Sequence, residues 1–155
     1  SVTPFAGQNY GAGKYGRLKK GVRVSIGMSA VITLALSAIM VLFARPILTI
    51  FTPDHDVLEI GVSMVRFLAP SYITYILIEL LSGAIRGAGK SLVPTLITIF
   101  GVCGLRLLWL FTMVPVYHTI NMVAASYPIT WSVTSIALLL YYCFGKWLTP
   151  PKEIV

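Results

Sequence analysis

Ile78-Glu79-Leu80-Leu81-Ser82-Gly83-Ala84-Ile85-Arg86-Gly87-Ala88-Gly89-Lys90-Ser91 is the stretch that decides the fold. It joins one apolar run to a second, 92–114, through a glycine-rich corner that carries Arg86 and Lys90. Basic residues at the ends of apolar runs are typical of the water-facing turn of a membrane hairpin, and glycine lets the backbone bend there. Glu79 lies inside the first run, where carboxylates are rare. The stretch therefore predicts two membrane-spanning helices.

The composition supports a membrane protein. Of the 155 residues, 57% are hydrophobic and 11% are charged, and the mean hydropathy is +0.85. A soluble domain carries about 25% charged residues. The formal net charge of +7 comes mostly from basic residues at the ends of apolar runs, where they act as orientation signals. We therefore expect a lipid bilayer as partner and no nucleic acid.

Four apolar runs are long enough to cross a bilayer, which needs about 20 residues in a helix. Pro70 should kink or split the second run, and residues 1–6 are expected to be the end of a further helix. The loops are expected at 7–23, 44–56 and 116–126, the first of them with an interfacial helical turn. The predicted fold is an all-α polytopic membrane helix bundle with spans at about 22–43, 57–84, 92–114 and 127–144.

The loop charges alternate from one side of the membrane to the other. Loop 7–23, the corner at 86–90 and the C-terminal tail together contain nine Lys and Arg residues. The loop 44–56 contains Arg45 alone, and 116–126 contains none. Basic residues accumulate in cytoplasmic loops, so we expect a multi-pass protein of the plasma (inner) membrane with a cytoplasmic C-terminus.

Two glycine-rich corners share one pattern. Gly7-x-x-x-Gly11-Ala12-Gly13-Lys14 has the spacing of Gly83-x-x-x-Gly87-Ala88-Gly89-Lys90. Either the chain contains an internal repeat of one membrane corner, or two flexible turns use glycine independently because tight turns select it. The sequence leaves both explanations open.

Two nucleotide-binding motifs are matched only in part. Gly11-Ala12-Gly13-Lys14-Tyr15-Gly16 fits G-x-G-x-x-G, but a membrane helix follows and no acidic residue occurs before Asp54, whereas a dinucleotide site needs one about 20 residues later. Gly89-Lys90-Ser91 resembles the end of a phosphate-binding loop, but Ala84 occupies the position of its first glycine. We expect no cofactor, no metal site and no enzymatic activity.

Glu79 is the strongest candidate for a site residue. At helical rise it lies about 10 Å from Arg86 and therefore at membrane depth. It is either a carboxylate that binds a proton or other coupling cation or a cationic substrate, or an interhelical hydrogen-bond partner. Tyr75, one turn earlier, lies on the same helix face.

Arg106 and several aromatic residues are further candidates. Arg106 lies about 24 Å from Lys90 along the third span, where it either reaches the outer headgroups or faces the bundle interior. Tyr72, Tyr75 and Trp131 could line an aromatic cavity for flat cations. Aromatic belts at the membrane interface use the same residue types.

Taken together and in order, these motifs resemble those of the multidrug and toxic compound extrusion (MATE) transporters. The motifs that carry the resemblance are Gly7-Gln8-Asn9-x-Gly11-Ala12-Gly13 before a basic stretch, Pro70, Gly83-x-x-Arg86-Gly87-x-Gly89, Arg106, and Pro128-Ile129-x-Trp131. Their positions imply that residues 1–155 are part of the C-terminal lobe of a protein with twelve helices in two six-helix lobes. The glycine motifs and Arg86 would then be cytoplasmic loop motifs.

The resemblance also implies a function. MATE transporters export cationic, often aromatic compounds in exchange for H⁺ or Na⁺, and some carry an ion-coupling acid in the helix of Glu79. Tyr75 is an alternative equivalent of that acid. The chain would lack its N-terminal lobe as a partner and would not transport alone. Two alternatives are a flippase or exporter of lipid-linked sugars with a related fold, and a small membrane scaffold subunit without transport activity.

Overall fold

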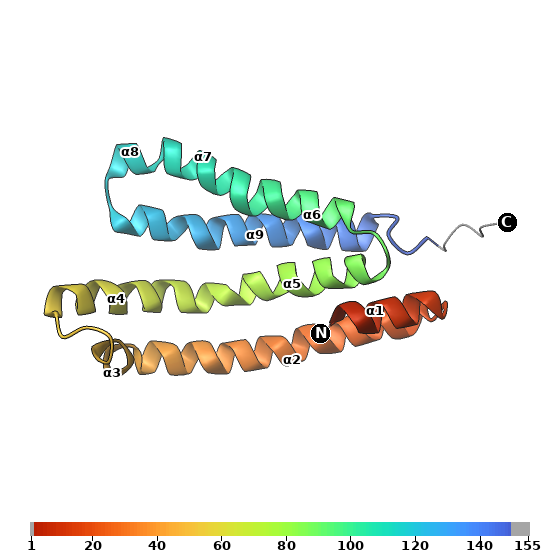
Figure 1. Cartoon of the computed structure of the whole chain (residues 1–155), viewed down its shortest axis with the longest axis horizontal. Helices are drawn as coiled ribbons and strands as arrows, with labels where there is room; N and C mark the ends of the chain where they lie inside the picture. The colour runs from red at the N-terminus through yellow and green to blue at the C-terminus, as the bar shows by residue number, and fades with distance from the viewer. Residues whose placement is uncertain (1, 150–155) are drawn as a thin grey trace.

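The computed structural model describes residues 2–149, and every regular element in this range is helical (Figure 1). The all-α fold class is therefore confirmed. The elements are α1 (Val2–Gly11), α2 (Tyr15–Leu42), α3 (Ala44–Thr49), α4 (His55–Leu68), η1 (Ala69–Ser71), α5 (Tyr72–Gly87), α6 (Leu92–Thr98), η2 (Ile99–Gly104), α7 (Leu105–Thr112), α8 (Val114–Tyr117) and α9 (Ile120–Phe144).

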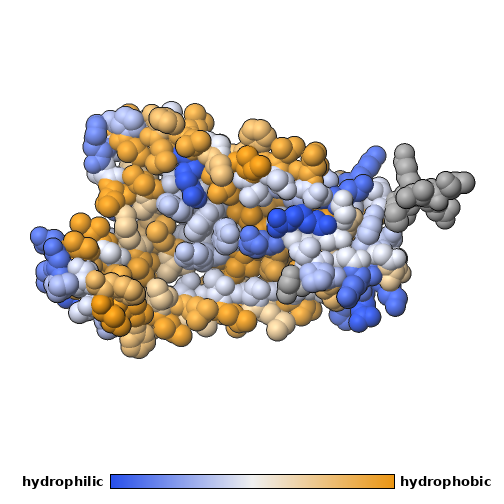
Figure 2. All heavy atoms as spheres, in the orientation of Figure 1, coloured by the Kyte–Doolittle hydropathy of each residue, from blue (hydrophilic) through white to orange (hydrophobic). Residues whose placement is uncertain are grey.

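Four helical rods in the described range are long and apolar enough to cross a membrane, as the sequence predicted. They lie side by side along the long axis of the molecule (Figure 1). Apolar residues cover the upper and lower rods in this view, and hydrophilic residues lie at both ends of the bundle and in the band between the rods (Figure 2). The spans are Tyr15–Leu42, His55–Gly87, Leu92–Tyr117 and Ile120–Phe144.

The first predicted loop, 7–23, is mostly wrong. Gly7-Gln8-Asn9 is part of α1, the loop is limited to residues 12–14, and α2 begins at Tyr15. Lys and Arg are good helix formers and no proline interrupts residues 15–23, so the basic stretch continues directly into the apolar span. The helix therefore extends seven residues beyond its predicted start at 22.

The loops at the other end of the bundle are also shorter than predicted. Residues 44–49 form α3, and α9 begins at Ile120 rather than at 127. Pro128 consequently lies inside α9, because membrane helices tolerate proline where neighbours satisfy the freed backbone groups. The ion pair between Arg45 and Glu59 connects α3 to α4. Lys152 and the end of the polar tail lie outside the described residues.

Pro70 interrupts the second span, as predicted. The helix passes through the 3₁₀ turn η1 between α4 and α5. Ser37 Oγ on α2 donates a hydrogen bond of 2.6 Å to the Ala69 carbonyl in this turn. A side chain from a neighbouring helix thus compensates for the irregular backbone.

The third span contains a π-helical segment, η2, that the sequence analysis did not predict. It packs against α9 at Gly101, where a Cβ atom would lie 2.2 Å from Thr134 Oγ1. Only glycine permits this approach. The wider π turn changes the direction in which the following residues, including Arg106, point from the helix axis.

Helix α5 is the centre of the bundle, with α9 on one side and α1 and α2 on the other (Figure 1). Its buried face includes Ile78, Leu81, Ala84 and Ile85. At its C-terminal end, Gly83 and Gly87 let α1 approach closely, because a Cβ at Gly87 would lie 2.4 Å from the Thr3 carbonyl oxygen. Small residues of this kind are the usual contact between membrane helices.

The two glycine-rich corners have the same backbone geometry. Gly13 and Gly89 both have positive φ, +68° and +79°. Lys14 N–H donates to the Asn9 carbonyl, and Lys90 N–H donates to the Ile85 carbonyl. The shared sequence pattern therefore specifies one type of helix C-terminal turn, used twice and at the same end of the bundle (Figure 1).

Candidate functional site

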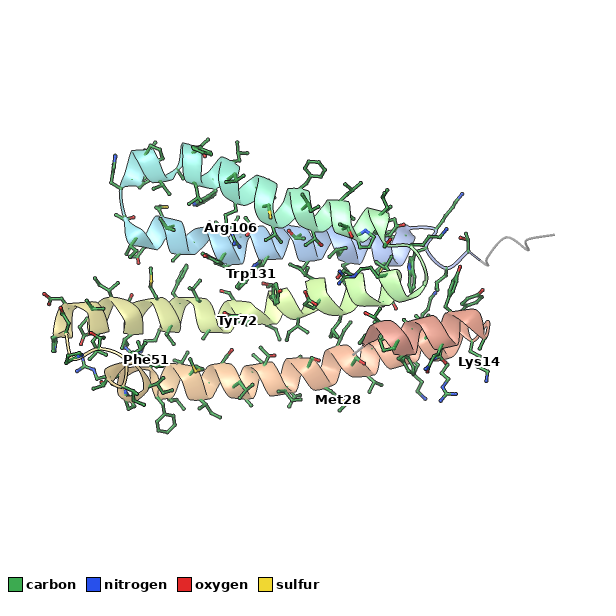
Figure 3. All side chains as sticks on the ribbon, viewed as in Figure 1. Lys14, Met28, Phe51, Tyr72, Arg106 and Trp131 are labelled. Carbon is green, nitrogen blue, oxygen red and sulfur yellow. The ribbon has the colours of Figure 1, made fainter. Side chains whose placement is uncertain are left out.

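The candidate site is a series of aromatic rings where α9 meets the start of α5. The ring of Trp131 has its centroid 5.3 Å from Tyr72, 5.3 Å from Tyr75 and 5.6 Å from Tyr127. We call these four residues the aromatic row. Trp131 is only 7% exposed, whereas Tyr72 is 49% exposed. Figure 3 shows Tyr72, Trp131 and Arg106 at mid-length of the bundle.

Helical spacing brings the four rings together. Tyr72 and Tyr75 are three residues apart at the start of α5, directly after the turn at Pro70. Tyr127 and Trp131 are four residues apart on α9. Both spacings place side chains on one face of a helix, and the packing of α5 on α9 brings the two faces into contact.

Glu79 continues the row beyond Tyr75. The Tyr75 hydroxyl donates a hydrogen bond of 3.3 Å to Glu79 Oε1, across one helical turn. The Glu79 side chain is exposed on the surface of the described chain. This hydrogen bond is not the predicted interhelical one, because both residues belong to α5.

Arg106 lies at the other end of the row. Its guanidinium group is 4.0 Å from the centroid of the Tyr127 ring, which is a cation–π contact. Arg106 Nη2 also donates to Thr130 Oγ1 at 3.3 Å. Its Nε atom is buried without a hydrogen-bond partner among the described residues. Of the two predicted positions, the bundle interior is therefore the one that Arg106 takes.

Threonine hydroxyl groups on α9 are oriented by hydrogen bonds to their own helix, and one of them accepts a hydrogen bond from Arg106. Thr130 Oγ1 donates to the Ser126 carbonyl at 2.7 Å, and Thr134 Oγ1 donates to the Thr130 carbonyl at 2.6 Å. With its proton used in this way, the Thr130 oxygen keeps its lone pairs for the guanidinium. Buried Thr130 thus fixes one edge of the Arg106 side chain.

A mostly apolar cavity of about 410 Å³ adjoins the row between α2 and α4. Tyr72 belongs to both the cavity and the aromatic row. This volume lies within the usual range of small-molecule sites, about 300–1,000 Å³. The residues that line it are Thr33, Leu36, Ser37, Met40, Met64, Val65, Leu68, Ala69 and Tyr72.

The structure brings five predicted site residues into one connected series. Tyr72 and Tyr75 each contact Trp131. Glu79 joins through Tyr75, and Arg106 joins through Tyr127. The sequence analysis did not select Tyr127 or Thr130. Tyr127 lies four residues before Trp131, and this helical spacing was the signal that could have selected it. The signal was missed because Tyr127 was placed at the start of a helix, directly after a loop predicted at 116–126.

The predicted loop motifs lie away from this site and have structural contacts. Gly7 packs on Gly87, since a Cβ at Gly7 would be 3.2 Å from the Gly87 carbonyl oxygen. The buried side chain of Asn9 donates from Nδ2 to the Phe5 carbonyl at 2.8 Å. Arg86 Nη2 donates to Ser82 Oγ at 3.0 Å. The remaining motif residues, Gln8, Gly11, Gly13 and Gly89, are exposed at or next to the two corners.

Within residues 2–149, no cluster of three or more His, Cys, Asp or Glu side chains is arranged to hold a metal ion. Glu79 is the carboxylate next to the aromatic row, and the Tyr75 hydroxyl is its hydrogen-bond donor. The Glu79 carboxylate and the partly exposed rings of Tyr72 and Tyr75 can contact a flat organic cation. Arg106 places a positive charge at the other end of the row.

Comparisons with known proteins agree with the motif pattern. A family model described as MatE matches residues 1–112. A probable multidrug resistance protein, YoeA of Bacillus subtilis (strain 168), is 28% identical over 99% of this chain and 33% of its own length. A probable multidrug resistance protein, NorM of Thermotoga maritima, is 26% identical over 95% of this chain and 32% of its own length. The chain thus spans about a third of the length of the relatives it matches.

Proposed function

The chain belongs to the MatE family, and from this premise we propose that it is part of a multi-pass membrane transporter that exports cationic or aromatic compounds in exchange for H⁺ or Na⁺. Its matched relatives carry names of multidrug resistance proteins. The observation that carries the proposal is the aromatic row between Glu79 and Arg106.

Tyr72 and Tyr75 provide the proposed contact surface for the substrate. They are partly exposed, whereas Trp131 behind them is buried and holds their rings in place. Aromatic faces attract organic cations by about 0.5–2 kcal/mol for each good contact. The adjoining cavity of about 410 Å³ would accept apolar parts of the same molecule through the shared residue Tyr72.

Glu79 is the proposed carboxylate for the substrate cation or the coupling ion. An exposed carboxylate at membrane depth is stable only where it faces water or other protein rather than lipid. We therefore assign the face of α5 that carries Glu79 to a hydrated substrate path. A proton or Na⁺ that neutralises Glu79 would weaken its attraction for a cationic substrate, which is the exchange that an antiporter needs.

Arg106 has a different proposed role, because it already occupies the face of Tyr127. A fixed positive charge at that end repels a second cation and directs it toward Tyr75 and Glu79. The site also contains Glu79 next to the row, so it is poorly suited to the diphosphate group of a lipid-linked sugar. No contact described above favours a scaffold role.

The remaining parts of the proposal concern the whole transporter. Residues 1–155 would form part of its C-terminal lobe and would depend on an N-terminal lobe, because alternating access is movement of one half against the other around a central site. The chain alone would then bind substrate without transporting it. The basic corners and the C-terminus are assigned to the cytoplasmic side of the plasma (inner) membrane.

The test is efflux of a cationic dye such as ethidium by the transporter polypeptide that contains this chain. Glu79→Gln keeps the size of the side chain and removes its charge, so efflux should fall at least about tenfold, the change expected when about 1.4 kcal/mol of interaction is lost. The dependence of dye efflux on the H⁺ or Na⁺ gradient should change as well. Glu59→Gln is the matched control, because Glu59 is exposed and pairs with Arg45 at one end of the bundle.

Two outcomes would contradict the proposal. Unchanged dye efflux and ion dependence in Glu79→Gln would remove Glu79 from the site. An equal loss in the Glu59→Gln control would indicate a general effect on folding or insertion.

A further inference from the structure

A second cleft, of about 340 Å³, lies between α1 and the first turns of α2. It differs from the cavity beside the aromatic row because its rim is positively charged. Arg17 and Lys20 lie on the rim, Ser25 supplies a hydroxyl group, and Phe5, Gly21 and Val24 complete the lining. Neither the family membership nor the proposed transport function uses these side chains.

Gly21 creates the apolar floor of the cleft. A Cβ atom at Gly21 would lie 2.2 Å from Cε1 of Phe5, so the aromatic ring rests directly against the α2 backbone. Any larger residue would displace the ring. Val24, one turn closer to the membrane and 52% exposed, continues the apolar surface.

The cleft lies at the depth of lipid headgroups. The 19 residues from Val24 to Leu42 span about 28 Å at 1.5 Å per residue, which matches the hydrocarbon thickness of about 30 Å. Lys20 and Arg17 are then about 6 Å and 10 Å outside the hydrocarbon edge. The headgroup layer extends about 5–8 Å beyond the hydrocarbon on each side, so it contains Lys20, and Arg17 lies just outside it.

The positive charge of the cleft is not neutralised by the described part of the chain. Between residues 2 and 149 the one ion pair is Arg45 with Glu59, at the opposite end of α2. Lys14, Lys19 and Arg23 add to the positive charge of the same segment. Orientation in the membrane needs only such charges and no cavity, so the cleft and its partly exposed aromatic floor call for a further explanation.

We propose that this cleft binds one anionic phospholipid. Its phosphate lies between Arg17 and Lys20, the Ser25 hydroxyl donates to a headgroup or ester oxygen, and the upper part of an acyl chain lies on Phe5 and Val24. Basic pockets between membrane helices are a recognised type of site for such headgroups. Phosphatidylglycerol is a lipid with this chemistry, because it has one anionic phosphate and a neutral glycerol headgroup.

The experiment measures lipid binding to the transporter polypeptide that contains this chain, in neutral detergent micelles, by native mass spectrometry. Phosphatidylglycerol, phosphatidylcholine and inorganic phosphate are titrated separately. We expect phosphatidylglycerol to bind at least about tenfold more tightly than phosphatidylcholine, because two cations at the membrane surface contribute to its affinity. Inorganic phosphate should bind more weakly than the lipid, because it has no acyl chain to contact Phe5.

Paired variants separate the cleft from general charge attraction. The double variant Arg17→Gln/Lys20→Gln should lose about 25-fold in affinity for phosphatidylglycerol, since each cation contributes about 1 kcal/mol. The control Lys19→Gln/Arg23→Gln removes the same charge from residues outside the cleft and should lose less than about threefold. Phe5→Ala tests the apolar floor without changing charge, and circular dichroism verifies that each variant is helical.

Three results would overturn the assignment: equal losses in the two double variants, equal affinity for phosphatidylglycerol and phosphatidylcholine, or inorganic phosphate bound as tightly as the anionic lipid. Equal losses in the two double variants would mean that the cleft is only part of a general basic surface. Tight binding of inorganic phosphate would mean that it is a simple anion site. None of them depends on dye efflux, so the lipid site and the transport proposal can fail separately.

Discussion

The two glycine-rich corners of this molecule have the same turn and different surroundings. Residues 12–14 join α1 to α2, and residues 88–91 join α5 to α6. In each corner a glycine with positive φ is followed by a lysine whose N–H closes the end of the helix. The local pattern therefore specifies the turn, whichever helices it connects.

The difference between the corners is in packing. Two residues before the glycine with positive φ, each corner has another glycine, which is Gly11 in the first corner and Gly87 in the second. A Cβ at Gly11 would have no heavy atom within 4 Å, whereas at Gly87 it would meet the backbone of α1. The equivalent glycine thus has no neighbour in the first corner and packs against a helix in the second. The reason is that α5 lies at the centre of the bundle and the end of α1 does not.

The corners also differ in charge. Arg17, Lys19, Lys20 and Arg23 follow the first turn, whereas the second is followed by Ser91 and an apolar run. The cleft beside the first corner measures about 340 Å³ and the one beside the second about 170 Å³. The comparison teaches that a repeated turn motif fixes backbone geometry, and that its neighbours determine what the turn contacts.

The largest expected effect comes from adding one methyl group at the packed position. Gly87→Ala places a Cβ 2.4 Å from the Thr3 carbonyl oxygen and 2.7 Å from Ala6 Cβ. Helix α1 must move away from α5, and we expect the free energy of unfolding to fall by about 3 kcal/mol, at the upper end of overpacking effects. Unfolding of the purified chain in mixed detergent and dodecyl sulfate micelles measures this change.

Gly11→Ala is the matched control in the first corner. Its Cβ meets open space, and alanine is the better helix former by about 1 kcal/mol. This variant should be neutral or slightly more stable. Equal destabilisation by Gly11→Ala and Gly87→Ala would contradict the difference in packing between the two corners.

A smaller and equal effect is expected at the two glycines with positive φ. Gly13→Ala and Gly89→Ala introduce a Cβ into a left-handed conformation that costs about 1–2 kcal/mol for other residues. No heavy atom lies within 4 Å of either added Cβ, so strain is the only term. The same micelle unfolding assay should give losses that agree within about 0.5 kcal/mol, the usual error of such comparisons.

Asparagine provides a second check on this prediction, because it tolerates the left-handed region better than alanine. Gly13→Asn and Gly89→Asn should each recover part of the loss. A large difference between positions 13 and 89 would show that the two turns do not share one geometry.

Much of the fold followed from the sequence. Four apolar runs, alternating loop charges and Pro70 were enough to predict the spans, their order and the break in the second rod, because each depends on local composition. Helix ends were less predictable. Residues 15–23 and 120–126 are polar or mixed, and their helical structure depends on continuity with the apolar span that follows rather than on their own hydropathy.

The candidate site was predictable as a set of residues and not as an arrangement. Glu79, Tyr75 and Arg106 stood out because ionisable and hydroxyl groups are conspicuous in apolar runs. Their connection through Tyr127 and Trp131 depends on the packing of α5 on α9 and on the π segment before Arg106. The spacing of the rings is visible within each helix, but the sequence of one helix does not reveal which face of another helix it meets. The clefts likewise exist only after the helices have packed.

The smallest expected effect is at the second corner, in lipid binding. Lys90→Gln removes the one cation that lines the cleft of about 170 Å³, which also includes Ser91, Leu92 and Tyr141. One cation beside half the volume does not form a headgroup site, so affinity of the transporter polypeptide for phosphatidylglycerol should change less than twofold, as expected for a screened surface charge. Lys20→Gln in the first corner should lower it by about fivefold, since one cation at the membrane surface contributes about 1 kcal/mol. Equal losses at Lys20 and Lys90 would mean that the corners attract lipid through net charge alone, and the distinction drawn from the two clefts would then fail.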